Sequence, residues 1–195
     1  MPWKRIFLLV LITYGAYHHF SNRPIMHGSG VIANAQPRQN ATSQANLTLN
    51  DYAITPLQSF EIEARVLSAE HYSLGREADL APVDLALGWG PMSDEAVLSK
   101  IKVSQSNRFY HWHVDAFPIP REQIESNSAN MHMIPADSAI EKVLKSIRVG
   151  QVVKLSGYLV EAKAQDGWHW RSSLSRTDTG NGACELIYVK SLEIR

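Results

Sequence analysis

The segment Arg108–Asp115, RFYHWHVD, carries the residue types and the spacing that come closest to a metal site. In an extended chain alternate residues share a face, so His111 and His113 lie about 6–7 Å apart at Cα and can share one metal ion. Asp115 or His132 would complete the set of ligands. The alternative is that these histidines are packing and hydrogen-bonding groups, because two ligands do not by themselves define a metal site.

Cys184, the one cysteine of the chain, is the second candidate for chemistry. A cysteine nucleophile needs a base that forms its thiolate, and His169 precedes it in a predicted hairpin. This order of histidine and cysteine resembles that of cell-wall L,D-transpeptidases, although their Ser-x-Gly-Cys context is replaced here by NGAC at 181–184. The alternative is a buried cysteine at the start of a strand, since cysteine is among the most buried residue types.

Aromatic side chains form the third group of candidates. Trp112, Trp168 and Trp170 are the predicted ligand-binding residues, because aromatic rings exposed on a strand can form a platform for a ligand or a glycan. The alternative is a role in the core, since strand alternation by itself places aromatic side chains on one buried face.

A few regular elements must position these candidates, and Asp137–Val160 is the most clearly patterned of them. Four branched apolar residues follow helical spacing, and Asp137 or Ser138 can cap the helix, Ser138 together with Glu141 as a capping box. After Gly150 the chain alternates as a strand with one buried face. The apolar helix positions are Ile140, Val143, Leu144 and Ile147.

The remaining patterns suggest a β-rich fold. Alternation predicts strands at 59–67 and 108–115, a short extended piece at 83–87, and three strands after the helix. The segment 121–136 is predicted as a surface loop. Because an OB-fold sets a helix between its third and fourth strands, we predict a mainly β, α+β fold, a small and partly open OB-like β-barrel with one amphipathic helix. A different α+β sheet packing is the alternative.

The amino-terminal segment indicates location. Lys4 and Arg5 precede an apolar run, Ile6–Tyr17, in the layout of a signal sequence or signal anchor. The positive-inside rule then predicts a single-pass protein of the bacterial inner membrane, held through residues 6–20, with its carboxyl-terminal part in the periplasm. The alternative is a buried helix of a soluble domain. The predicted organisation is an uncleaved transmembrane helix at 1–20, a flexible linker at 21–50 and an extracytoplasmic β-rich domain at 51–195.

Composition narrows the partners. Lys+Arg and Asp+Glu are balanced at 19 each, for a formal net charge of zero, whereas nucleic-acid binding relies on clustered cations. We therefore expect no nucleic-acid partner. We also expect no cofactor, and envelope proteins are the candidate partners.

Five motifs lie between Leu80 and Ile194: GWGPMSD, QSNRFYHW, SANMHMIPA, VGQVVKLSGYLVEA and SLSRTDTGNGACE. Together they resemble a group of bacterial proteins with a short amino-terminal membrane segment. The resemblance implies a setting in the bacterial envelope and assigns no catalytic residue.

These observations predict a membrane-anchored, extracytoplasmic module for binding or scaffolding, more a binding protein than an enzyme. The alternative is an envelope enzyme. It would be either a metal-dependent hydrolase acting through His111 and His113, or a thiol-dependent acyl transferase acting through Cys184 and His169.

Overall fold

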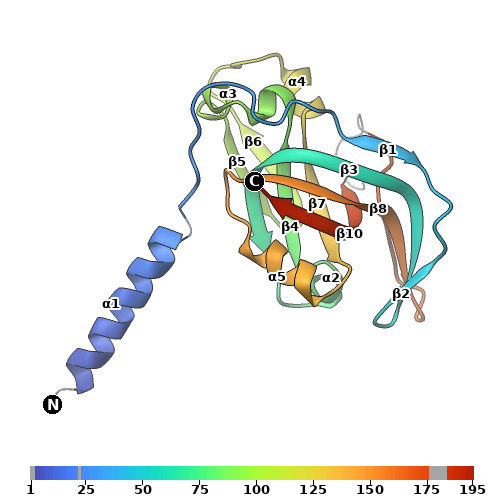
Figure 1. Ribbon diagram of the computed structural model, residues 1–195, viewed down its shortest axis with the longest axis horizontal. Coiled ribbons are helices and arrows are strands. Elements are labelled where there is room, and N and C mark those ends of the chain that lie inside the picture. Colours follow the sequence, from blue (N-terminus) through green and yellow to red (C-terminus); the bar gives the residue numbers. More distant parts are fainter. Residues whose placement is uncertain (1–2, 22, 176–183) are drawn as a thin grey trace.

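The computed structural model describes residues 3–21, 23–175 and 184–195, and it is a β-rich α+β structure (Figure 1). Its helices are α1 (Trp3–Ser21), α2 (Arg76–Leu80), η1 (Gly90–Ser93), α3 (Glu95–Leu98), α4 (Arg121–Ser126) and α5 (Ser138–Ser146). Its strands are β1 (Arg38–Ala41), β2 (Leu47–Leu49), β3 (Tyr52–His71), β4 (Val83–Gly88), β5 (Lys102–Ser106), β6 (Phe109–His113), β7 (Ser128–Pro135), β8 (Val152–Ala164), β9 (His169–Arg171) and β10 (Glu185–Ile194).

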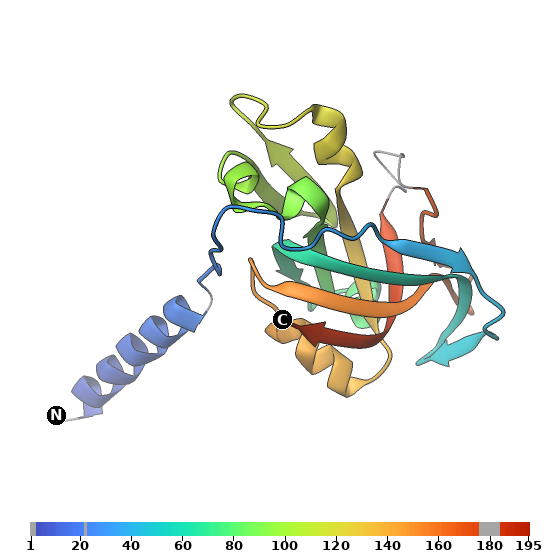
Figure 2. The same ribbon diagram turned by 45° about the horizontal axis from the view of Figure 1, so that its top comes forward.

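Five strands close into a ring. In order around it, β3 pairs with β4, β4 with β7, β7 with β10, β10 with β8, and β8 again with β3. The β7–β10 pair is parallel and the other four pairs are antiparallel. Strands β1 and β2 extend the ring from β3, and β9 extends it from β8. Strands β5 and β6 form a separate two-stranded sheet, which lies above the ring in Figure 2.

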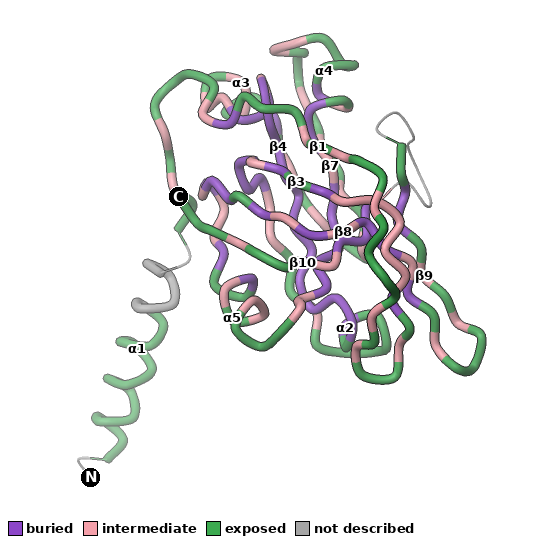
Figure 3. Tube along the Cα trace, turned by 45° about the vertical axis from the view of Figure 1, so that its right-hand side comes forward, coloured by how far each residue is buried: buried purple, intermediate pink, exposed green. Residues whose placement is uncertain are grey.

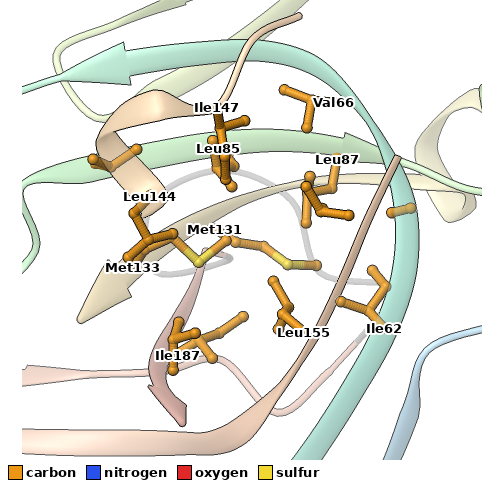
Figure 4. Packing of buried hydrophobic residues seen from close by; sticks show 14 of the residues in the cluster. Ile62, Val66, Leu85, Leu87, Met131, Met133, Leu144, Ile147, Leu155 and Ile187 are labelled. Atoms are coloured by element: carbon orange, nitrogen blue, oxygen red, sulfur yellow. The ribbon is translucent and has the colours of Figure 1, made fainter. Parts of the chain in front are cut away.

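The main core fills the ring, and α5 covers part of it. Leu144 of α5 and Ile147, the residue that caps its carboxyl end, point into the cluster that also holds Met131 and Leu155 (Figure 4). Helical spacing therefore predicts Ile140, Leu144 and Ile147 on this face correctly, whereas Val143 is not part of the cluster. Asp137 is the N-cap, with its carboxylate accepting a hydrogen bond from the Ile140 N–H at 2.9 Å, so the capping box on Ser138 is not the arrangement used.

Gly157 explains how β8 sits so close to β10. A Cβ at this position would lie 1.9 Å from the carbonyl oxygen of Tyr188, so only glycine permits the approach of the two backbones. The register between these strands then shifts between Val189 and Ser191.

Two segments differ from the sequence-based predictions. Residues 121–136, predicted as a loop, form α4 and the central strand β7. The short extended piece predicted at 83–87 is confirmed as β4, which is also a strand of the ring. Segment 108–115, predicted as a strand of the barrel, instead supplies β6 of the separate hairpin. Burial explains why the strand at 128–135 was missed: the polar face of β7 lies beneath other elements, so its residues do not show the usual polar-out pattern. Strand β4 is covered on both faces and also lacks alternation.

The described part of the predicted linker, 21–50, contains regular structure. Strands β1 and β2 lie within it, both paired with β3. Upstream of them the Ile25 N–H donates to the Val149 carbonyl at 2.9 Å, and the Ala33 N–H donates to Ser93 Oγ at 3.1 Å. This stretch lacks periodicity because its hydrogen bonds go to distant residues rather than to neighbours.

Helix α1 stands apart from the β-rich part of the molecule (Figure 1). Its residues from Trp3 to Gly15 are exposed, as the green trace in Figure 3 shows. Across 3–21, 23–175 and 184–195, no helix combines the length and the apolar character that crossing a membrane requires.

Candidate functional site

The best candidate site is a cleft of about 660 Å³ beside β6, called here the β6 cleft. Its walls come from β6 and the segment after it, from α4, and from the first residues of β7 and β10. Its lining is rich in aromatic side chains, with polar groups among them, which is the usual character of a ligand site. The lining includes Trp89, Phe109, Tyr110, His111, Trp112, His113, Phe117, Arg121, Asn130 and Cys184.

Strand β6 owes its position to a tight hairpin. Asn107 and Arg108 connect it to β5 and both have positive φ, 50° and 69°, as a two-residue turn of type I′ requires. Tyr110 and Trp112 turn toward the rest of the molecule, whereas the side chains on the other face are exposed. The alternation predicted for this segment is confirmed, although on a strand outside the ring.

Arg108 fastens the tip of this hairpin to the ring. Its Nη1 donates to Asp84 Oδ1 at 2.6 Å and to the carbonyl oxygen of Ala81 at 2.9 Å. Asp84 is fully buried, so this guanidinium supplies the charge that its carboxylate needs. The guanidinium carbon also lies 3.7 Å from the centre of the Tyr72 ring. The left-handed conformation of Arg108 is therefore held by an ion pair and a stacked ring.

His132 lies beside the buried Asp84 and does not line the β6 cleft. Its Nδ1 is 2.9 Å from Asp84 Oδ1, although at an angle unsuited to a hydrogen bond. Its ring lies 4.7 Å from that of Trp170. His111 and His113 line the cleft instead, so the structure does not bring the three histidines together.

Asp115 is the predicted ligand that lies near a cleft histidine, with Oδ1 3.4 Å from Nε2 of His113. Within the described residues, no group of three or more His, Cys, Asp or Glu side chains is arranged to hold a metal ion.

Cys184 lines the β6 cleft and is partly exposed. Its Sγ lies 3.9 Å from Nδ2 of Asn130 and 4.0 Å from the carbonyl oxygen of Arg108. His169, its predicted base, lies on β9 and lines a different, smaller hollow of about 230 Å³. The structure thus assigns the two members of the predicted pair to different hollows. The turn predicted at 177–182 lies outside the described residues.

The three candidate tryptophans also lie at different places in the structure. Trp112 lines the β6 cleft, with its ring centre 6.1 Å from that of Phe117. Trp168 and Trp170 pack edge to face at 6.3 Å on β9 and the segment before it. Of these two, Trp168 borders the smaller hollow, and Trp170 covers His132.

Sequence reasoning did not identify Asn130 or Ser128 as part of the cleft wall. Asn130 donates from Nδ2 to the Arg108 carbonyl at 2.9 Å and accepts from Gln105 Nε2 at 2.6 Å. The hydroxyl of Tyr110 lies 2.8 Å from Ser128 Oγ, and burial raises the pKa of Tyr110 to about 12. One signal was available: Asp84 within the apolar run VDLALG, because a buried carboxylate requires a cation or strong donors.

A larger hollow of about 1130 Å³ lies beside α2 and α5. Its lining is mostly polar and charged: Arg76 pairs with Asp166 and Lys145 with Glu141, and Asp51, Asp79 and Asp137 also line it. The Arg76 guanidinium lowers the pKa of Asp166. Because Arg76 and Lys145 are already paired and the aromatic groups converge elsewhere, the β6 cleft is the stronger candidate for a ligand despite its smaller volume.

No protein-family model, curated protein or solved structure matches this chain.

Proposed function

We propose that this protein is a membrane-associated binding module of the bacterial envelope, with its β-rich domain outside the cytoplasm and its ligand in the β6 cleft. The observation that carries the proposal is the cleft itself, in which several aromatic side chains converge with amide, histidine and arginine groups.

The ring supports a finer description as an OB-like barrel. Its strands follow the order 1-2-3-5-4 around the ring, with α5 between the third and fourth and a parallel pair between the third and fifth. OB-folds bind oligomers across the face of strands two and three, which are β4 and β7 here. The β5–β6 hairpin lies on that side of β4 and β7, so the β6 cleft is the remaining access at the margin of that face.

Helix α1 supports the proposed membrane association. Lys4 and Arg5 precede apolar side chains that are between 50% and 62% exposed from Ile6 to Ile12, and a bilayer would cover them. The apolar run is shorter than the about 20 residues of a standard span. The proposal is therefore a short signal anchor, with the domain on the side opposite to Lys4 and Arg5.

Membrane association is tested by fractionating cells that express the full chain. Replacing Leu8 and Leu11 with Asp should move the protein from the alkali-washed membrane fraction to the soluble fraction. Leu74→Asp is the control, because Leu74 is 90% exposed but lies outside α1. A wild-type chain that is wholly soluble after alkaline washing would contradict the proposal.

Ligand binding is tested by NMR on the full chain in detergent micelles. Titration with peptidoglycan fragments and with a mixed pool of short peptides should shift the resonances of residues that line the β6 cleft. Trp112→Ala should weaken binding about tenfold or more, whereas Trp168→Ala, outside the cleft, should leave it within about twofold. Shifts confined to other surfaces would argue against this site.

A thiol enzyme is the second candidate function, because Cys184 lines the same cleft with the Asn130 amide 3.9 Å from its Sγ. It predicts turnover of an envelope acyl substrate that Cys184→Ala abolishes. Such turnover would replace the binding proposal. Unchanged ligand binding by Cys184→Ala, with no turnover by either protein, would remove the enzyme candidate.

A further inference from the structure

The β6 cleft follows one edge of β6. Residues from both faces of the strand line it: Tyr110 and Trp112 from the inner face, and Phe109, His111 and His113 from the outer face. No residue of β5 is part of the lining. A cleft bordered by both faces of a strand, but not by its paired neighbour, must run along the unpaired edge.

The hairpin turn determines which main-chain groups point to that edge. In a two-residue hairpin the residues that flank the turn, here Ser106 and Phe109, hydrogen-bond to each other. Narrow and wide pairs then alternate, so His111 and His113 also direct their main-chain groups toward β5. Tyr110 and Trp112 direct theirs away from β5 and toward the cleft.

These outward groups have no protein partner in the part of the chain that the structure describes. Strand β6 pairs with β5 alone, and no described residue hydrogen-bonds to the main-chain N–H or C=O of Tyr110 or Trp112 on the other side. The strand also lacks the lysine, proline or bulge that usually protects an edge, since its sequence is FYHWH. Its edge is thus open and rich in residues that favour strands.

The opposite wall of the cleft is a second edge that has no paired strand among the described residues. Residues Ser128 and Asn130, at the start of β7, pair with β4 on one side, whereas β10 joins the other side only from Met131 onward. The Arg108–Asp84 pair and the Asn130 hydrogen bond hold the hairpin at its tip, which keeps the cleft in shape without a ligand.

From this geometry we propose that the β6 cleft binds an extended peptide segment of a partner protein, which adds as a strand to the free edge of β6. The inference deepens the proposed binding function and rests on it. An extended peptide fits because its main-chain groups repeat every about 6–7 Å on one side, the spacing between Tyr110 and Trp112. A glycan has no such repeat of alternating donors and acceptors.

The partner segment is short, because β6 offers two outward residues. Its main chain supplies affinity by pairing with Tyr110 and Trp112, while alternate side chains meet the aromatic lining around Phe117. The sequence preference should therefore fall on alternate positions, with apolar or aromatic side chains directed into the cleft.

The test uses the full chain in micelles and peptides of twelve residues selected from a random display library. For a selected peptide, N-methylation at two alternate positions should weaken binding about tenfold each, since each removes one main-chain donor, while the positions between them change affinity less than about threefold. Hydrogen exchange should show the amides of Tyr110 and Trp112 protected at least tenfold on binding. The amides of Phe109, His111 and His113 should change little.

A matched variant separates main-chain pairing from side-chain contact. In Trp112→Ala the selected peptide should bind more weakly, yet the alternating N-methyl pattern should persist because the main chain is unchanged. Loss of the pattern in wild type, or protection confined to amides outside β6, would overturn the inference.

The proposed function and this inference fail in different ways. If no peptide is selected but peptidoglycan fragments shift the cleft residues, strand addition is wrong and the binding site stands. If selected peptides bind but protect amides outside β6 from exchange, the β6 cleft is the wrong site for both the proposed function and this inference. If neither probe shifts the cleft residues, both proposals fall.

Discussion

Strands β6 and β9 look alike in sequence and differ in what the fold does with them. Each alternates histidine with tryptophan, FYHWH in β6 and HWR in β9 after Trp168. Trp170 of β9 covers the buried His132, whereas Trp112 of β6 lines an open cleft. The difference arises because β9 pairs with a ring strand, while β6 belongs to a hairpin outside the ring. Alternation therefore predicts a strand, but its neighbours decide whether an aromatic face becomes core or site.

Arg108 joins the two regions. Its main chain forms the turn before β6, and its guanidinium carbon lies 5.6 Å from the ring of Trp170 on β9 while pairing with Asp84 on β4. If this link holds β6 in place, removing it should release the hairpin and leave the ring folded.

The largest effect is expected from Asp84→Ala. Breaking a buried ion pair by removing one partner costs about 3–5 kcal/mol, and the loss here should lie toward the lower end because Arg108 keeps a longer contact with Glu77, 3.7 Å from Nε to Oε2. Urea unfolding should show this loss, and hydrogen exchange should show β6 amides exchanging faster than those of β8. The double variant Asp84→Leu/Arg108→Met removes both charges and should recover part of the loss. Equal loosening of β6 and β8 would mean that Arg108 does not act on the hairpin selectively.

Trp170→Ala and Trp112→Ala compare the two strands directly. Trp170 contacts the buried cluster but is partly exposed, so its removal should cost about 2–3 kcal/mol, below the about 3–5 kcal/mol of a fully buried tryptophan. Trp112→Ala should cost less stability and more ligand affinity. Urea unfolding and binding titrations of both variants measure these effects. If Trp112→Ala cost more stability than Trp170→Ala, the core role would belong to β6.

High pH should loosen the β6 region before it affects β9. Burial raises the pKa of Tyr110 to about 12, above its ordinary value of 10.0. The unfolded chain therefore loses this proton first, so the stability that Tyr110 contributes is complete below about pH 10 and declines as pH rises toward 12. Absorbance of tyrosinate and urea unfolding across this window measure both quantities, with Tyr110→Phe as the control. A Tyr110 that titrates near pH 10 in the folded protein would show that it is not buried.

The smallest effect is expected from Arg171→Ala on β9. Its Nη1 lies 3.4 Å from Glu161 Oε2, and its side chain is half-exposed, so the pair is worth about 0.2–1 kcal/mol. Thermal unfolding in low and high salt checks this. A loss as large as that of Asp84→Ala would mean that charge pairs on β9 and on the hairpin tip are equivalent.

Local patterns account for much of the fold and little of the site. Helix α5 and strand β8 follow from periodicity, because α5 turns its apolar face toward the main core and the alternating residues Val153, Leu155 and Leu159 of β8 do the same. The pattern around His111 and His113 identified a strand, and part of the cleft lining, but not its partners. Asn130 and Asp84 became relevant only once the hairpin lay across β4 and β7.

The sequence alone therefore determined the β-rich α+β class, the amphipathic helix and the alternation within RFYHWHVD, since these depend on residues a few positions apart. Tertiary structure decided which strands close the ring, that His132 is buried away from His111 and His113, and that one edge of β6 stays open. These features depend on pairing between distant segments, and no local period records which strand will lie beside which.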